Sequence, residues 1–145
     1  MSAAHPTHLA ALVAWFEALT PDNVARTAEF YAPDALFHDP FNDVRGTSQV
    51  QRIYAHMFEQ VGEPRFEVHD SFSQGDRAVL LWTFRFRSGA QACEVEGASR
   101  LLFNAAGLIT SHRDYWDPVP AVYGRLPVLG RLLGWARRRL AAPQH

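Results

Sequence analysis

The first part of the chain carries apolar residues at a helical spacing. Apolar side chains three and four positions apart predict helices over residues 7–19 and 47–61. Residues 20–31 predict another helix, with Thr20 at its start and Pro21 in its first turn. A short apolar run at residues 35–39 predicts a strand between the second and third helices.

After Pro64 the apolar period changes from 3.6 to 2. Alternating or branched apolar content predicts four strands, over residues 65–72, 77–87, 92–104 and 108–117, with turn-forming stretches between them. Helices followed by a run of antiparallel strands indicate an α+β fold, in which the helices lie on one face of a curved sheet.

The last residues form a separate region. We divide the chain into a domain over residues 1–118 and an extension over residues 119–145, in which a helix is predicted after Pro127. Its apolar stripe has helical spacing and arginines lie outside it, next to Trp135; the stripe consists of Leu129, Leu132, Leu133, Ala136 and Leu140. A basic amphipathic helix with a tryptophan is typical of contact with an anionic membrane surface.

The membrane contact would use Leu129, Leu132, Leu133, Arg137, Arg138 and Arg139. The alternative is that the leucine stripe packs on the domain, closes a pocket mouth or lies in a dimer interface. The sequence leaves this choice open.

Composition and charge narrow the class of protein. A chain of 145 residues is long enough for one domain with a substantial core. Residues 1–118 hold nine arginines against fifteen acids and residues 119–145 hold five arginines and no acid, which gives the net charge of −1. A nucleic-acid binder would carry a basic main domain, so we expect no nucleic-acid partner. The single cysteine, Cys93, and the lack of a signal peptide favour a cytoplasmic location.

Two stretches resemble a known family. The stretch "FYAPDALFHDPFNDVRGTSQVQRIY" is similar to the part of ketosteroid isomerase that holds its catalytic Asp-Pro pair, and "GLITSHRDYWD" is similar to the last strand of limonene epoxide hydrolase. The order of elements resembles the same superfamily, the nuclear transport factor two-like proteins, which also include SnoaL-type polyketide cyclases. The resemblance covers the chain from about Leu9 to Asp117.

The resemblance implies a cone-shaped roll, with a mainly antiparallel sheet, three N-terminal helices on its concave face and a pocket between them. It places Asp39 at the position of the isomerase's general base, Trp15 at its oxyanion-hole tyrosine and Ser99 at its protonated aspartic acid. It places Asp114 at a catalytic aspartate of the hydrolase. It also implies a homodimer that pairs through the outer face of the sheet, and chemistry without a cofactor or a metal.

The residues themselves predict an apolar site with ionisable groups. Alternation along residues 109–117 sets Thr110, His112, Asp114 and Trp116 on one face of a strand. An apolar wall disfavours the charged form of a carboxyl group and so brings proton transfer within reach at neutral pH. We therefore predict that Asp39 and Asp114 act as an acid/base pair, with His112 orienting one of them or sharing its proton. The predicted substrate-binding residues are Trp15, Ile53, Phe58, Trp82, Phe84, Phe86, Ser99 and Trp116.

Structural explanations exist for each of these acids. Asp39 before Pro40 is also a good turn former, and Asp114 can pair with Arg113, Arg100 or His112 inside the sheet. The histidines show no metal-binding spacing, so no metal is expected. The sequence favours a SnoaL-like enzyme of isomerase, cyclase or epoxide hydrolase type acting on a small hydrophobic molecule. The alternatives are a non-catalytic module that binds a hydrophobic ligand, and an adaptor that acts through its C-terminal helix.

Overall fold

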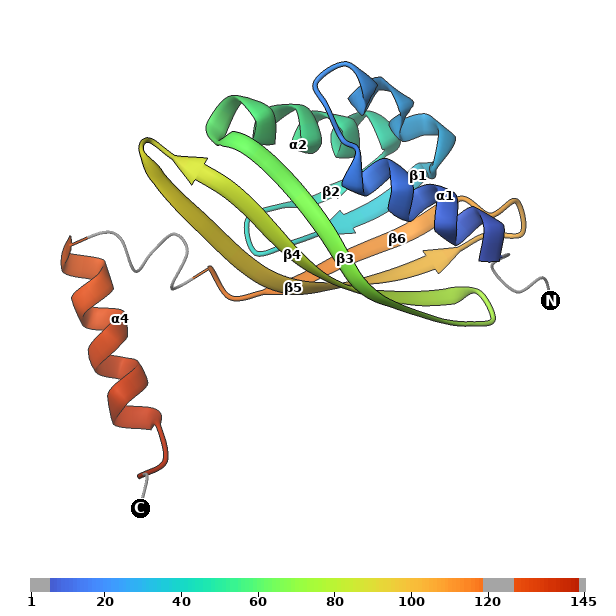
Figure 1. Ribbon diagram of the computed structural model, residues 1–145. Coiled ribbons are helices and arrows are strands. Elements are labelled where there is room, and N and C mark those ends of the chain that lie inside the picture. The colour runs from blue at the N-terminus through green and yellow to red at the C-terminus, as the bar shows by residue number, and fades with distance from the viewer. Residues whose placement is uncertain (1–5, 119–126, 144–145) are drawn as a thin grey trace.

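The centre of the molecule is a curved six-stranded sheet. The computed structural model describes residues 6–118 and 127–143. The strands lie in the order β2-β1-β6-β5-β4-β3, and only β1 and β6 run parallel to each other. Figure 1 shows how the long strands β3, β4 and β5 curve around the helices. Their bounds are β1 Tyr31–His38, β2 Asp43–Arg45, β3 Gly62–Gln74, β4 Arg77–Ser88, β5 Gln91–Phe103 and β6 Ile109–Trp116.

The α+β prediction is confirmed, with two differences in detail. All four strands predicted after Pro64 are present, whereas the short strand β2 was not predicted. The helix predicted over residues 20–31 is a shorter 3-10 helix, η1 Asn23–Glu29, and Tyr31 already belongs to β1. The buried residues of η1, Val24 and Thr27, are three positions apart, which is the spacing that brings side chains into line in a 3-10 helix.

The remaining helices agree with the prediction. They are α1 Pro6–Glu17, α2 Thr47–Gln60 and α4 Pro127–Leu140. Helices α1 and α2 lie over the hollow of the sheet, and the main core fills the space between these layers (Figure 1). The largest fully buried apolar side chains of this core come from α1, α2 and four strands: Leu12, Tyr31, Phe37, Val50, Leu80, Leu101 and Ile109.

The alternation of β6 holds only for its second half. His112 is buried and Asp114 half-buried, while Arg113 and Tyr115 between and after them are exposed, as predicted. Earlier in the strand the prediction is wrong, because Ile109 is fully buried in the core. The pairing with β5 shifts between Ile109 and Ser111, so the extra residue Thr110 reverses which side chains face inward.

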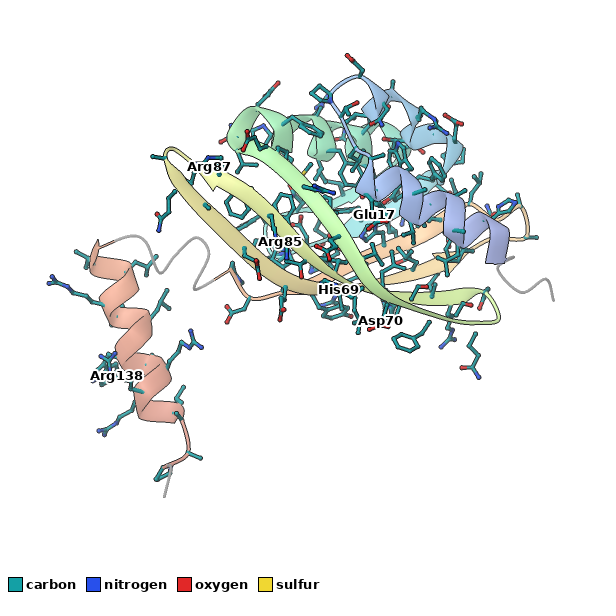
Figure 2. All side chains as sticks on the ribbon, in the orientation of Figure 1. Glu17, His69, Asp70, Arg85, Arg87 and Arg138 are labelled. Atoms are coloured by element: carbon teal, nitrogen blue, oxygen red, sulfur yellow. The ribbon has the colours of Figure 1, made fainter. Side chains whose placement is uncertain are left out.

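The helix α4 lies apart from the sheet in Figure 1. Its apolar side chains are exposed: Leu132 by 59%, Trp135 by 56% and Leu140 by 86%. Figure 2 shows Arg138 on this helix, away from Arg85 and Arg87 of β4. In the described part of the chain, no helix is long and apolar enough to cross a bilayer.

Candidate functional site

A pocket opens between the concave face of the sheet and the helices. It holds about 330 Å³ of empty space, part of which is open to solvent. Most of its wall is apolar. The neighbouring strands β5 and β6 contribute a serine, a histidine and an aspartate, and α2 contributes a tyrosine. The lining residues are Phe16, Tyr54, Phe66, Val68, Leu80, Trp82, Ser99, His112 and Asp114.

Asp114 is the carboxylate of this pocket, and it is held by two donors. Ser99 lies directly opposite it on β5, and the Ser99 hydroxyl donates to Asp114 Oδ1 at 2.5 Å. His112 Nε2 lies 2.6 Å from the same oxygen, because residues two apart on a strand share a face. The Asp114 side chain is 17% exposed and that of His112 only 3%. Both of these hydrogen bonds end on Oδ1. Among the described residues no hydrogen bond to Oδ2 is found, so this oxygen remains for a group in the pocket.

A chain of hydrogen bonds continues from His112 into the core. His112 Nδ1 lies 2.6 Å from the hydroxyl of Tyr31, which lies 2.7 Å from the hydroxyl of Tyr54. The imidazole is enclosed by aromatic rings, with Phe37 at 4.7 Å and Phe16 at 6.0 Å between ring centroids. The network is satisfied, since no buried side-chain polar atom of the described residues lacks a hydrogen-bond partner.

Burial keeps the two tyrosines protonated. It raises the pKa of Tyr31 and that of Tyr54 well above the ordinary value, because a phenolate would lose its hydration in the core. The negative charge of Asp114 raises both pKa values further. At neutral pH both hydroxyls therefore remain hydrogen-bond donors.

Trp82 forms one wall of the pocket and orients Ser99. Its indole Nε1–H donates to Ser99 Oγ at 2.8 Å, so the single proton of Ser99 is directed to Asp114. The indole lies against Gly97, where a Cβ atom would come within 2.3 Å of the ring. Gly97 thus leaves the space in which Trp82 can reach Ser99.

Four predicted site residues come together in this pocket. They are the catalytic candidates His112 and Asp114, and the binding candidates Trp82 and Ser99. Ile53, Phe58, Phe84, Phe86 and Trp116 are partly buried and pack against the core, outside the pocket lining. Phe84 stacks between Phe66 and Phe86, so that this row of rings extends the apolar face of the sheet away from Asp114.

Trp15 does not line the pocket, contrary to the prediction. It is 3% exposed and stacks on Phe30, and its indole N–H donates to the backbone carbonyl of Asn23. This N–H holds the start of η1 and is not directed toward a ligand. The indole therefore stabilises the fold behind the site.

Asp39 does not line the pocket either. Its Oδ1 accepts hydrogen bonds from the backbone N–H groups of Phe41 and Asn42, and both its oxygens accept from the Asn42 side-chain amide. The carboxylate thus closes the turn between β1 and β2. It still acts at a distance on the site, since its charge contributes to the raised pKa of Tyr54.

Sequence reasoning missed the two tyrosines of the network. Tyr31 stands at the start of β1, where the sequence predicts the end of a helix. Tyr54 lies on α2, whose apolar spacing does not reveal that the tyrosine hydroxyl has a polar role. The pocket residues Phe16, Phe66, Val68 and Leu80 were also missed as lining residues. Tyr54 gave one usable signal, because a tyrosine on a buried helix face needs a partner for its hydroxyl.

Metal ligands are not grouped in the described residues. Within residues 6–118 and 127–143, no three His, Cys, Asp or Glu side chains come close enough together to hold an ion. The one carboxylate–imidazole pair in the pocket, Asp114 with His112, is joined directly by a hydrogen bond.

Comparisons with known proteins agree on the family. A sequence model of the SnoaL-like domain matches residues 12–112. A steroid Δ-isomerase from Nocardioides simplex is 29% identical over 112 residues, which are 75% of this chain and 89% of that enzyme.

Solved structures show the same fold at low identity. A LEH-like epoxide hydrolase from M. tuberculosis has a TM-score of 0.67 and 20% identity, covering 88% of this chain and 95% of its own. A protein with a ketosteroid isomerase-like fold from Catenulispora acidiphila, in complex with trimethylamine, has a TM-score of 0.69 and 18% identity, covering 83% and 92%. The sheet order, the pocket and the matched residues thus lead to one conclusion: the chain belongs to the SnoaL-like family, within the nuclear transport factor two-like fold.

Proposed function

We propose that the protein is an enzyme that transfers a proton on a small apolar substrate, with Asp114 as the acid/base group. One observation carries this proposal: a half-buried carboxylate with one uncommitted oxygen stands in an apolar pocket. His112 and Ser99 hold the other oxygen. A fixed carboxylate next to an apolar ligand is suited to proton abstraction, because the group is already oriented and little water competes with it.

The reaction we favour is the shift of a double bond next to a carbonyl group. Asp114 Oδ2 would take a proton from the carbon between the carbonyl and the double bond, and would return it two carbons further along. The substrate isomerises, and Asp114 ends the cycle as the carboxylate with which it began. The similarity to a steroid Δ-isomerase supports this type of chemistry over the opening of an epoxide.

A small β,γ-unsaturated ketone such as 3-cyclohexenone tests the proposal. Conversion to the conjugated ketone is followed by ultraviolet absorbance, for the wild type and for Asp114→Asn. Turnover by the wild type that falls about a hundredfold or more in Asp114→Asn supports the proposal. Equal rates for the two proteins contradict it.

The same variant separates an enzyme from a binding module. Asp114→Asn keeps the size of the side chain, so a protein that only stores an apolar ligand retains its affinity and shows no turnover in either form. Loss of turnover with retained affinity instead identifies Asp114 as a group of the chemical step.

A second function is favoured by the exposed face of α4. Its apolar stripe is formed by Leu129, Leu132, Leu133, Ala136 and Leu140. Arg137 and Arg139 flank this stripe on its two sides, and Arg131 and Arg138 lie on the opposite face of the helix. The helix has no acidic residue, so its charge is complementary to an anionic bilayer. We propose that α4 lies in the surface of such a membrane, with Trp135 at the boundary between apolar and charged sides.

Vesicle pelleting tests this contact. Phosphatidylcholine vesicles with and without about one third phosphatidylglycerol are compared for three proteins. These are the wild type, Arg137/138/139→Gln, and the control Arg45/52/77→Gln, which makes the same charge change on the domain surface. We expect roughly a hundredfold loss of partitioning for the α4 variant alone. Equal pelleting of the two arginine variants contradicts a role for α4.

We also propose that two chains pair through the outer face of the sheet. Phe72, Leu81 and Tyr115 leave this face partly apolar, with Phe72 59% exposed. Light scattering distinguishes the possible interfaces: Leu81→Glu should give the mass of a monomer, whereas Leu132→Glu on α4 should not. The reverse result would place the interface on α4.

A further inference from the structure

The hydrogen-bond chain that begins at Asp114 returns to the pocket. It runs from Asp114 through His112 and Tyr31 to Tyr54, over contacts of 2.6, 2.6 and 2.7 Å. Asp114 and Tyr54 both line the pocket, whereas Tyr31 is 1% exposed and does not. The residues at the two ends of this buried chain therefore line one pocket and could contact the same ligand.

The hydrogens of this chain can be arranged in two ways. With a neutral His112, Nε2–H donates to Asp114, Tyr31 donates to Nδ1, and Tyr54 donates to Tyr31. With a charged His112, Nδ1–H donates to Tyr31 and Tyr31 donates to Tyr54, so that the Tyr54 hydrogen is released for a ligand. The state of the imidazole thus decides whether Tyr54 accepts or donates a hydrogen bond in the pocket.

We propose that Asp114, His112, Tyr31 and Tyr54 form a proton relay, in which Asp114 is the base and Tyr54 the acid of one reaction. This inference rests on the proposed function and adds a second group that touches the substrate. When Asp114 Oδ2 takes a proton from carbon, Tyr54 gives its proton to the substrate oxygen. In the same step Tyr31 gives its proton to Tyr54, and His112 Nδ1 gives its proton to Tyr31.

The proton balance closes without any further reactant. The ion pair of carboxylate and imidazolium becomes a neutral carboxylic acid and a neutral imidazole, while the ketone becomes an enol. The reverse transfer along the relay, with return of the proton from Asp114 to a different carbon, completes the isomerisation. The net charge of the buried site stays the same at each stage, which matters because charge is poorly solvated there.

The surroundings of the relay favour coupled transfer. The groups that face His112 from the other elements are uncharged: Phe16 from α1, and Tyr31 and Phe37 from β1. Asp114 is the charged group in contact with it, and Asp39 acts on the far end, on Tyr54. Since burial opposes a phenolate at either tyrosine, Tyr54 can release its proton only as Tyr31 replaces it.

Tyrosine-to-phenylalanine variants test the relay with 3-cyclohexenone as the probe. Tyr54→Phe removes the acid, and Tyr31→Phe breaks the relay without touching the substrate. Tyr115→Phe makes the same change on the exposed side of β6 and serves as the control. We expect about a tenfold or larger loss of kcat for the first two and none for the control. The solvent deuterium isotope effect should fall in Tyr31→Phe, because fewer protons move in the chemical step.

Nitrogen NMR of the imidazoles gives a second readout that needs no turnover. The His112 signals are assigned by their loss in His112→Gln. We expect Tyr31→Phe to shift the Nδ1 signal of His112, because it removes the direct hydrogen bond. Tyr54→Phe has no direct bond to His112, but it removes the acceptor of the Tyr31 hydrogen, so we expect it to shift the same signal when the imidazole is charged. Tyr115→Phe should leave it in place.

The outcomes separate the two proposals. In one outcome Asp114→Asn abolishes turnover, while Tyr31→Phe has the same rate and the same His112 signal as Tyr115→Phe. The relay is then wrong, and the proposal that Asp114 is the base stands. If Asp114→Asn is as active as the wild type, the proposed function fails, whatever the tyrosine variants do. A shifted His112 signal with an unchanged rate also overturns the relay, since the hydrogen bonds would then be structural only.

Discussion

Asp39 and Asp114 occupy the same level of two neighbouring strands, yet the fold uses them differently. The parallel strands β1 and β6 pair up to His38 and Arg113, so each aspartate is the next residue of its chain. Strand β6 continues to Trp116 and keeps its carboxylate in the pocket, whereas β1 ends at His38 and turns. A turn exposes backbone N–H groups, and the Asp39 carboxylate accepts two of them.

This difference shows that the role of an acid depends on what the backbone does at that point. Asp114 lies within a paired strand, where the backbone groups are already hydrogen-bonded to each other. Its carboxylate therefore bonds to side chains. Asp39 lies where the backbone needs an acceptor. Two aspartates at one level of a sheet therefore need not form a pair that shares a proton.

The largest expected effect compares the two carboxylates directly. Asp114→Asn should lower turnover of 3-cyclohexenone by a factor of about 10² to 10⁴, because an amide cannot accept the proton. Asp39→Asn should stay within a few fold of the wild type, since an amide oxygen still accepts the turn hydrogen bonds. Steady-state rates of the two variants check this. An equal loss in both would restore the acid/base pair that the sequence alone suggests.

The next effect concerns the packing of Trp82 on Gly97, which positions Ser99 beside Asp114. Gly97→Ala would place a methyl group against the Trp82 indole, which lies within 2.3 Å of the Cβ position. We expect a loss of about 1–3 kcal/mol in the free energy of unfolding, together with lower turnover, because the ring must move away from Ser99. Thermal denaturation and rates measure both. Gly62→Ala, at the start of β3, is the matched control, and its Cβ would contact Arg87 at an ordinary 3.4 Å.

The decrease of stability at alkaline pH distinguishes the buried tyrosines next to Asp114 from the turn at Asp39. The pKa values of Tyr31 and Tyr54 are raised in the folded protein, so their contribution is complete below about pH 10 and is lost as the pH rises through the folded values. Each tyrosine should remove about 1.4 kcal/mol of unfolding free energy per pH unit in that range. Urea unfolding at several alkaline pH values tests this. Tyr31→Phe should make the slope shallower, and Asp39→Asn should not change it.

Much of the fold can be predicted from the spacing of apolar residues, because a helix or strand with one buried face has apolar side chains at regular intervals. The four strands after Pro64 and the helices α1, α2 and α4 agree with the predicted segments. Strand alternation correctly predicts the inward-facing side chains where the pairing is regular, as for His112 and Asp114. It fails at Ile109 and Thr110, where one extra residue shifts the pairing with β5 without any signal in the apolar pattern.

The remaining misses depend on contacts between segments that are distant in sequence. Tyr31 and His112 are 81 positions apart, so their hydrogen bond arises only because β1 lies beside β6 in the sheet. Trp15 has the right character for a pocket wall, and only the position of Asn23 decides that its N–H is used elsewhere. The apolar pattern predicts which faces of the helices and strands are buried, but it does not predict which buried polar groups form hydrogen bonds with each other.

The smallest expected effect isolates the role of Asp39 in its turn. Asp39→Ala removes an acceptor of two backbone N–H groups and should lower the free energy of unfolding by about 1–2 kcal/mol, whereas Asp39→Asn should lose less than half of that. Because the turn is partly solvated, water can replace some of the lost bonds, which sets the upper limit. Chemical denaturation resolves the two variants. A result in which Asp39→Ala is as stable as the wild type would mean that the carboxylate is not needed for the turn, and the reason for its presence would then have to lie in the reaction.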